Sequence, residues 1–171
     1  MERQLQHLLD RQAILDCLNR YCFGLDRHDG EMIASAFHPD ALDEHGPFTG
    51  GPEALVEWAN SFHSSEFQSH SHSLTSHACE IDGNTAHAHS YCLYGLARRE
   101  GESVAFGCAR YIDRLERRDG QWRIALRKVL IEWRGEFRSH LPVGYLSGRW
   151  DRQDLIYQRP LVPANTSHNH E

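Results

Sequence analysis

Residues 81–122, IDGNTAHAHSYCLYGLARREGESVAFGCARYIDRLERRDGQW, contain three turn signals between long runs of alternating residues. The signals are DGN (82–84), REGES (99–103) and RRDG (117–120). Asp-Gly between alternating runs is typical of a β-hairpin. The pattern therefore predicts an antiparallel meander of four strands, over residues 67–81, 85–98, 103–116 and 121–137.

Helices are predicted before these strands. Apolar residues recur at spacings of three and four, which is typical of an amphipathic helix; they are Leu5, Leu8, Leu9, Ile14, Cys17, Leu18, Tyr21, Cys22 and Leu25. Gly30 is the expected helix stop, a short helix over 31–37 ends before Pro39, and Pro52 suits the first turn of a third helix. Residues 41–51 are expected to form a small hairpin or irregular edge. The fold class is therefore α+β.

Composition limits the function. The 171 residues fit one domain, and their hydrophobic content of 40% predicts a folded core. A net charge of −6 argues against nucleic acid and against an anionic membrane as partner. Five scattered cysteines, a charged beginning and the lack of an apolar run of about 20 residues predict reduced thiols, no signal peptide and a cytoplasmic protein.

The last predicted strand suggests a partner subunit. In WRIALRKVLIEW (122–133), one face carries Trp122, Ile124, Leu126 and Leu130, and the other carries Ala125, Val129, Ile131 and Trp133. An antiparallel sheet with one wet face alternates cleanly, so both faces are expected to be covered. We expect the helices on one face and a second copy on the other, in a homo-oligomer that is a trimer or a dimer. Residues 138–171 are expected to form a partly flexible C-terminal extension that wraps the body of the 1–137 domain.

Two charged residues stand on faces that should be buried. Asp26 continues the inward stripe of the first helix and lies at its C-terminus, where the macrodipole disfavours an anion. It either makes an ordinary Asx turn or meets a cationic or donating partner. Arg127 lies among Ala125, Val129 and Ile131. It either meets a carboxylate, faces a pocket that receives an anionic group, or extends outward at an edge.

The stretch SHSHSLTSH (69–77) raises the question of a metal site. A four-ligand cluster of His77, Cys79, His87 and His89 needs odd positions opposite odd ones. A two-residue Asp82-Gly83 turn instead pairs even positions with odd ones. His72 would then share a face with His87, His89, Tyr91 and Leu93, so we expect no metal, although His-x-His pairs are common ligands.

The residues Tyr21, Asp26, His72 and Arg127, in this order, resemble the SnoaL-like branch of the nuclear transport factor 2-like superfamily. The supporting segments are RQAILDCLNRYCFGLDRHDG (11–30), FTGGPEALVEWAN (48–60), SHSHSLTSH (69–77) and ERRDGQWRIALRK (116–128). Within that branch the pattern is most similar to hexachlorocyclohexane dehydrochlorinase and bile-acid dehydratase, with scytalone dehydratase as a further relative.

The resemblance implies a cone-shaped barrel, in which a curved antiparallel sheet wraps three helices around a closed apolar pocket. By the same resemblance His72 is the base, Asp26 orients and charges it, and Arg127 stabilises a departing group or an oxyanion. Tyr21 matches an assisting tyrosine of the bile-acid enzyme, whereas the dehydrochlorinase has a lysine, which favours dehydration or isomerisation. We expect Phe67, His89, Tyr91 and Tyr111 to contact the substrate, and His70 to be a wall or oligomer residue.

These expectations combine into a cofactor-free lyase or isomerase that acts on a hydrophobic, cyclic small molecule. The main alternative is a non-catalytic ligand-binding or assembly module, similar to the small subunit of ring-hydroxylating dioxygenases. A third possibility is a metal-dependent enzyme that uses the His-rich hairpin.

Overall fold

The computed structural model describes residues 1–139 and 144–163. Its elements are, in order, α1 (Glu2–Arg27), α2 (Gly30–Ser35), β1 (Phe37–His45), β2 (Phe48–Gly50), α3 (Pro52–Glu66), β3 (Phe67–Asp82), β4 (Thr85–Arg98), β5 (Ser103–Arg118), β6 (Gln121–Arg138) and the 3₁₀ helix η1 (Leu155–Tyr157). This confirms the α+β class. None of the helices in the described ranges combines the length and the apolar character that crossing a bilayer requires.

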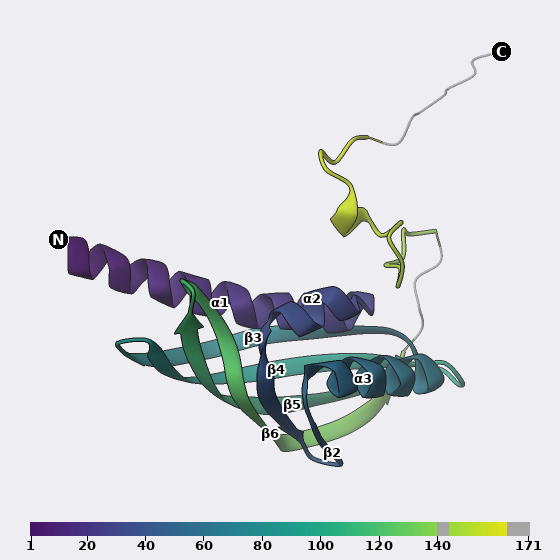
Figure 1. The fold of residues 1–171 in the computed structure, drawn as a ribbon. Coiled ribbons are helices and arrows are strands. Elements are labelled where there is room, and N and C mark those ends of the chain that lie inside the picture. Colours follow the sequence, from purple (N-terminus) through teal and green to yellow (C-terminus); the bar gives the residue numbers. More distant parts are fainter. Residues whose placement is uncertain (140–143, 164–171) are drawn as a thin grey trace.

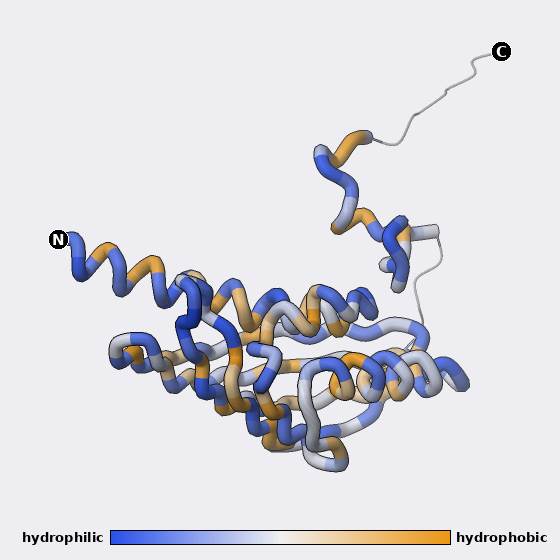
Figure 2. Tube along the Cα trace, in the orientation of Figure 1, coloured by the Kyte–Doolittle hydropathy of each residue, from blue (hydrophilic) through white to orange (hydrophobic). Residues whose placement is uncertain are grey.

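The six strands form one curved sheet in the order β2-β1-β6-β5-β4-β3, with the helices on its concave side (Figure 1). The four long strands make the predicted antiparallel meander, along which hydrophilic and hydrophobic residues alternate (Figure 2). The hairpin of β1 and β2 adds to the edge, with β1 parallel to β6. Because β2 and β3 are edge strands, the sheet is curved around the helices but does not close into a complete barrel.

The first helix ends differently from the prediction. His28, rather than a glycine, takes the left-handed conformation at the C-cap, with φ of 53°, and Asp29 then caps α2 by accepting a hydrogen bond from the Met32 amide. Gly30 is the first residue of α2, so its expected role as a helix stop is wrong. A non-glycine residue in this backbone region is uncommon, and here it turns a histidine side chain towards α3 and β3.

The apolar stripe of α1 is buried only in part. Leu5, Leu8 and Leu9 are exposed, whereas the stripe is buried from Ile14 onward. The N-terminal turns of α1 extend beyond the sheet (Figure 1), so the sheet has no surface there against which these leucines can pack. The helical spacing predicted the helix correctly, but it did not reveal where the supporting sheet ends.

A β-bulge in β3 changes which residues face the helices. The β3–β4 turn consists of Gly83 and Asn84, one residue later than predicted, and near it even positions oppose odd ones as expected. The register shifts between Leu74 and His77. Beyond this shift His72 lies opposite Tyr94, instead of sharing a face with Tyr91 as the unbroken ladder predicted. The extra residue in β3 therefore sends His72 to the concave side.

A second register shift positions Arg127. Ile124 pairs with Leu115, but Leu126 pairs with Arg114, so Ala125 is the additional residue in β6. After this bulge Arg127 faces the concave side, directly opposite Asp113 on β5. The Arg127 Nε and Nη2 atoms donate to the two Asp113 carboxylate oxygens at 2.7 and 2.9 Å, and both side chains are fully buried.

The rings of Tyr21 and Tyr111 pack against the Arg127 guanidinium of this ion pair. The Arg127 guanidinium carbon lies 4.3 Å from the centroid of each ring, which gives two cation–π contacts. Burial lowers the pKa of Arg127, but the charge and hydrogen bonds of Asp113, together with Tyr21 and Tyr111, outweigh it and raise that pKa. Arg127 therefore stays charged in the core, and the ion pair joins α1 to the middle of the sheet through Tyr21.

Residues 149–157 pack against the junction of α1 and α2. Trp150 stacks on His28 with ring centroids 3.9 Å apart, and Asp154 forms an ion pair of 3.0 Å with Arg27. The Tyr157 hydroxyl donates to Asp29 at 2.7 Å. These residues of the extension contact the body of the domain, whereas the expectation that the chain frays concerns residues 164–171, which lie outside the described ranges.

Removal of the Asp113 carboxylate should destabilise the fold strongly. Asp113→Ala leaves the buried Arg127 guanidinium without its counter-ion, and we expect a loss of about 3–5 kcal/mol in the free energy of unfolding. Urea unfolding followed by circular dichroism measures this loss. The matched control is Lys128→Ala, which removes the exposed pair with Glu44 and should leave the unfolding midpoint nearly unchanged. Equal midpoints for the two variants would contradict a central role for the Arg127–Asp113 pair.

Candidate active site

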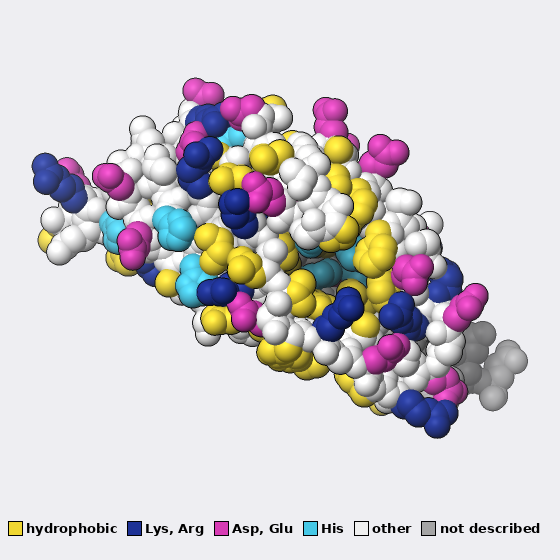
Figure 3. Space-filling model, turned by 90° about the horizontal axis from the view of Figure 1, so that it is seen from below, with side chains coloured by type: hydrophobic (Ala, Val, Ile, Leu, Met, Phe, Trp, Pro, Cys, Tyr) yellow, Lys and Arg dark blue, Asp and Glu magenta, His cyan; other side chains and the backbone are white. Residues whose placement is uncertain are grey.

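A cavity of about 730 Å³ lies between the helices and the concave face of the sheet. Its size is in the range of small-molecule sites. The wall is mostly apolar and aromatic, with contributions from Leu25, Ala59, Trp58, Phe62, Phe67, Leu96, Val129 and Ile131. The face of the molecule in Figure 3 is hollowed near its middle, with histidine side chains inside and hydrophobic and arginine side chains around the rim.

The Asp26 carboxylate connects the end of α1 to β3 beside this cavity. Its Oδ1 lies 2.7 Å from Nδ1 of His72, and its Oδ2 accepts the His72 backbone N–H at 2.9 Å. The His72 side chain is 9% exposed and lines the cavity. Since Nδ1 is held by the carboxylate, the Nε2 atom is the free nitrogen of the ring.

The two groups change each other's pKa. Burial lowers the pKa of His72, but the hydrogen bond and charge of Asp26 outweigh it, so the pKa is raised above the ordinary value of 6.5. For Asp26, burial opposes ionisation, yet the hydrogen bonds from His70 and His72 outweigh it and lower its pKa. Asp26 is therefore an anion at neutral pH, and it favours the protonated form of His72.

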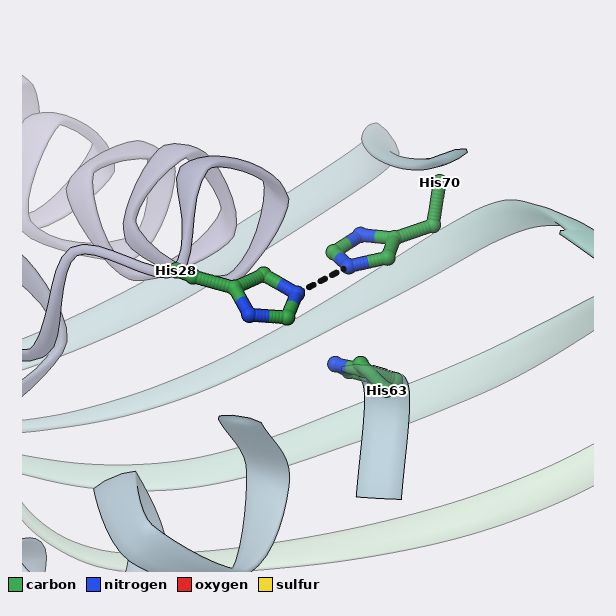
Figure 4. Close-up of side chains that lie close together, drawn as sticks. All are labelled: His28, His63 and His70. Carbon is green, nitrogen blue, oxygen red and sulfur yellow. Dashed lines mark hydrogen bonds between the residues drawn. The ribbon is translucent and has the colours of Figure 1, made fainter. Parts of the chain in front are cut away.

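Three further histidines surround this pair. His70 also approaches Asp26, with Nδ1 at 3.2 Å from Oδ1, and its Nε2 lies 3.0 Å from Nε2 of His28 (Figure 4). His63, from α3, points towards both rings, and its centroid is 4.4 Å from that of His70. His70 is buried against Asp26, so the expected position at an oligomer surface is wrong for this residue.

Three of the other predicted site residues line the cavity: Tyr21, Phe67 and Tyr111. The Tyr21 hydroxyl oxygen is buried and has no hydrogen-bond partner among the described residues. Burial, followed by the charge of Asp43, raises the pKa of Tyr21, so this hydroxyl keeps its proton beside Arg127.

The structure corrects three predicted contacts. His89 and Tyr91 lie on the convex face, because they alternate along β4 with the buried Ala88, Ser90 and Cys92, and they are not among the described residues of the cavity wall. Arg127 lies behind Tyr21 and Tyr111, bound to Asp113, and likewise does not line the cavity. For Arg127 the alternative of a carboxylate partner is the one that the structure contains.

The separate four-ligand cluster on the β3–β4 hairpin does not form. His77 and Cys79 are on the concave side, where Nδ1 of His77 lies 2.8 Å from the Ser90 hydroxyl, whereas His87 and His89 are on the other face. The predicted pairing of even with odd positions near the turn is the reason, and here the prediction was correct.

Several cavity residues were not foreseen, among them Trp58, Phe62, His63 and Tyr94. His63 carried a signal that went unused: it follows Leu55 and Ala59 at spacings of four, and all three are buried on one face of α3. Tyr94 carried none, because its pairing with His72 depends on the β3 bulge.

The arrangement can remove a proton from a bound molecule. A histidine with one nitrogen held by a carboxylate and the other facing an apolar cavity is a general base, and such catalysis contributes about 10²–10⁴-fold. Tyr21 contributes to the same wall, and its hydroxyl oxygen is buried beside Arg127. The apolar lining favours a hydrophobic ligand.

Comparisons with known proteins agree with the fold. The SnoaL-like domain family matches residues 6–128. Among solved structures, Rv3472 from Mycobacterium tuberculosis, a protein of unknown function, is 31% identical, with a TM-score of 0.66 and 74% of each chain covered. None of the curated proteins matches this chain.

Two more distant structures share the fold. The type 2 hexachlorocyclohexane dehydrochlorinase LinA is 24% identical, with a TM-score of 0.76 over 83% of this chain and 99% of that one. A putative scytalone dehydratase from Novosphingobium aromaticivorans is 20% identical, with a TM-score of 0.70 over 82% and 97% of the two chains. At these identities the likeness establishes the architecture.

The pKa of His72 gives a direct test of the Asp26 contact. We expect NMR titration of the imidazole to yield a pKa above 6.5 in the wild type and a lower one in Asp26→Asn, because the variant removes the negative charge but keeps the shape. The matched control is His87→Ala on the exposed convex face, which should leave the pKa of His72 unchanged. A His72 pKa unaffected by the substitution would contradict the contact.

Proposed function

Because the chain belongs to the SnoaL-like family, we propose that it is a lyase or isomerase that uses the Asp26–His72 pair to remove a proton from a hydrophobic, cyclic small molecule. The observation that carries the proposal is the 2.7 Å contact between Asp26 and a histidine on the wall of an apolar cavity. The proposed chemistry uses side chains alone.

In the proposed elimination, Nε2 of neutral His72 takes a proton from a substrate carbon. The electron pair of that C–H bond forms a C=C bond, and the C–O bond to the neighbouring hydroxyl breaks. Asp26 stabilises the imidazolium that forms, and Tyr21 donates a hydrogen bond to the departing oxygen. That oxygen takes up the proton from the imidazolium and leaves as water, which returns His72 to its neutral form. In an isomerisation, His72 returns the proton to a different carbon instead.

The nature of Tyr21 supports an oxygenated substrate. A neutral phenol that lacks an internal partner is suited to donate to a hydroxyl or carbonyl oxygen. Arg127 has a supporting role in this proposal, because it holds the Tyr21 and Tyr111 rings from behind and does not reach the ligand. Phe67 and Tyr111 shape the wall against which a ring would pack.

The pair should be essential for turnover. With cyclic β-hydroxy carbonyl compounds and chlorinated cyclohexanes as a screening panel, mass spectrometry detects loss of water or HCl, and deuterium uptake from D₂O detects proton abstraction. We expect His72→Ala and Asp26→Asn to lower turnover by about 10²–10⁴-fold. Activity should rise with pH with an apparent pKa above 6.5, because the base acts in its neutral form and Asp26 raises its pKa.

The control for this test is His89→Ala, on the convex face, which should keep wild-type activity. Equal loss in the control and in His72→Ala would contradict the assignment. If the wild-type protein binds panel compounds but neither exchanges nor eliminates, the non-catalytic ligand-binding alternative would replace the enzyme.

We also propose that the protein is a homo-oligomer assembled through the convex face of the sheet. Leu130, Trp133 and Phe137 on β6 are 40%, 50% and 51% exposed, and the Trp133 ring contacts Phe106 of β5. Adjacent exposed apolar side chains of this size are a common feature of protein interfaces.

The oligomer should dissociate when this surface is charged. Light scattering at micromolar concentration is expected to give a dimer or trimer mass for the wild type and a smaller mass for Trp133→Arg. Leu8→Arg, at the protruding end of α1, is the matched control and should keep the wild-type mass. A monomeric wild type would contradict the proposal.

A further inference from the structure

We propose that His28, His63 and His70 form a three-histidine site for a divalent transition metal of the Zn²⁺ type, next to the Asp26–His72 pair but separate from it. The three side chains come from the end of α1, from α3 and from β3, and converge in Figure 4. One ligand nitrogen from each lies within 4.8 Å of the others. The proposal does not depend on the proposed enzymatic function.

The spacing of the nitrogens suits such an ion. Zn–N bonds of about 2.0–2.1 Å in tetrahedral geometry place two ligand nitrogens about 3.3 Å apart. The Nε2 atoms of His28 and His70 are already 3.0 Å apart. A short side-chain rotation of His63, whose ring faces both, completes a set of three imidazoles, and water supplies the fourth ligand.

His63 provides the second, independent observation. It is only 8% exposed, and its buried Nδ1 has no hydrogen-bond partner among the described residues. A hydrogen bond from His28 to His70 accounts for the contact between those two rings, but it leaves this nitrogen unsatisfied. A buried polar atom without a partner costs about 1–3 kcal/mol. A metal ion bound by all three rings, with Nδ1 of His63 as one of the ligand atoms, removes that cost.

The surroundings of the cluster also fit a metal. His70 has its other nitrogen, Nδ1, 3.2 Å from the Asp26 carboxylate, which is the outer-sphere arrangement that orients metal-binding histidines.

Two backbone features hold the cluster in place. His28 occupies the left-handed region, with φ of 53°, and Asn60 on α3 donates to the His28 carbonyl at 3.4 Å. Trp150 stacks on the His28 ring and also lies beside His70. An ion here would link α1, α3 and β3, and Trp150 of the C-terminal extension would cover the site. Its expected role is therefore to stabilise the wall behind the cavity.

The second group of potential ligands, Asp26 with His70 and His72, is less suitable. Its Nδ1 atoms are occupied by contacts to the carboxylate at 3.2 and 2.7 Å, which a metal would have to displace. The three-histidine site leaves these contacts intact. It also leaves Nε2 of His72 free.

The test is titration of the metal-free, full-length protein with Zn²⁺ by calorimetry, and with Co²⁺ by visible absorption. We expect one ion per chain, the intense Co²⁺ bands of a four-coordinate site, and an increase in melting temperature with Zn²⁺. His28→Asn, which tolerates the left-handed backbone, and His63→Leu, a good helix former, should each weaken Zn²⁺ binding by about 100-fold or more.

The matched control is the double variant His168→Ala/His170→Ala, which removes two closely spaced histidines that do not belong to the proposed site. It should keep wild-type affinity. Circular dichroism establishes that each variant is folded. The proposal is overturned if the wild type shows no one-to-one binding, if His28→Asn and His63→Leu both retain wild-type affinity, or if the control variant is the one that loses the ion.

Discussion

The rest of this structure depends on the contacts that the Asp26 carboxylate makes with β3. It accepts the His72 backbone N–H, it contacts Nδ1 of both His70 and His72, and it thereby attaches the end of α1 to β3. An anion at the C-terminus of a helix is locally unfavourable, so these donors are needed to keep it there. The same contacts orient His72 towards the cavity and His70 towards His28.

A second buried charge supports the opposite wall. Arg127 and Asp113 pair across β5 and β6, and the guanidinium packs against both the Tyr21 and the Tyr111 rings. The two carboxylates therefore have different roles. Asp26 orients a potential base, whereas Asp113 holds Arg127, which positions aromatic residues. Asp26 and Arg127 are both buried, so each charge depends on its partner. Truncation of a partner side chain leaves that charge uncompensated, and it therefore affects the local structure more than the loss of one contact would.

The histidines around Asp26 differ in chemical state although they are close neighbours. Asp26 raises the pKa of His72, whereas burial lowers those of His28, His63 and His70. The raised pKa favours the protonated form of His72, and the lowered pKa values favour the neutral form of the other three. The proposed proton-transfer site and the proposed metal site therefore use different ligand nitrogens.

Local pattern specified the helices and strands, since helical spacing and Asp-Gly turns depend on neighbours along the chain, and it placed Asp26 on the inward face. The family resemblance joined Asp26 to His72. The pairing of His72 with Tyr94 and the inward position of Arg127 depended on two bulges, which reverse the face of the residues on one side of them and leave no clear mark in the sequence. The His28, His63 and His70 cluster required three elements to meet, and only the packing of α1 and α3 on the curved sheet brings them together.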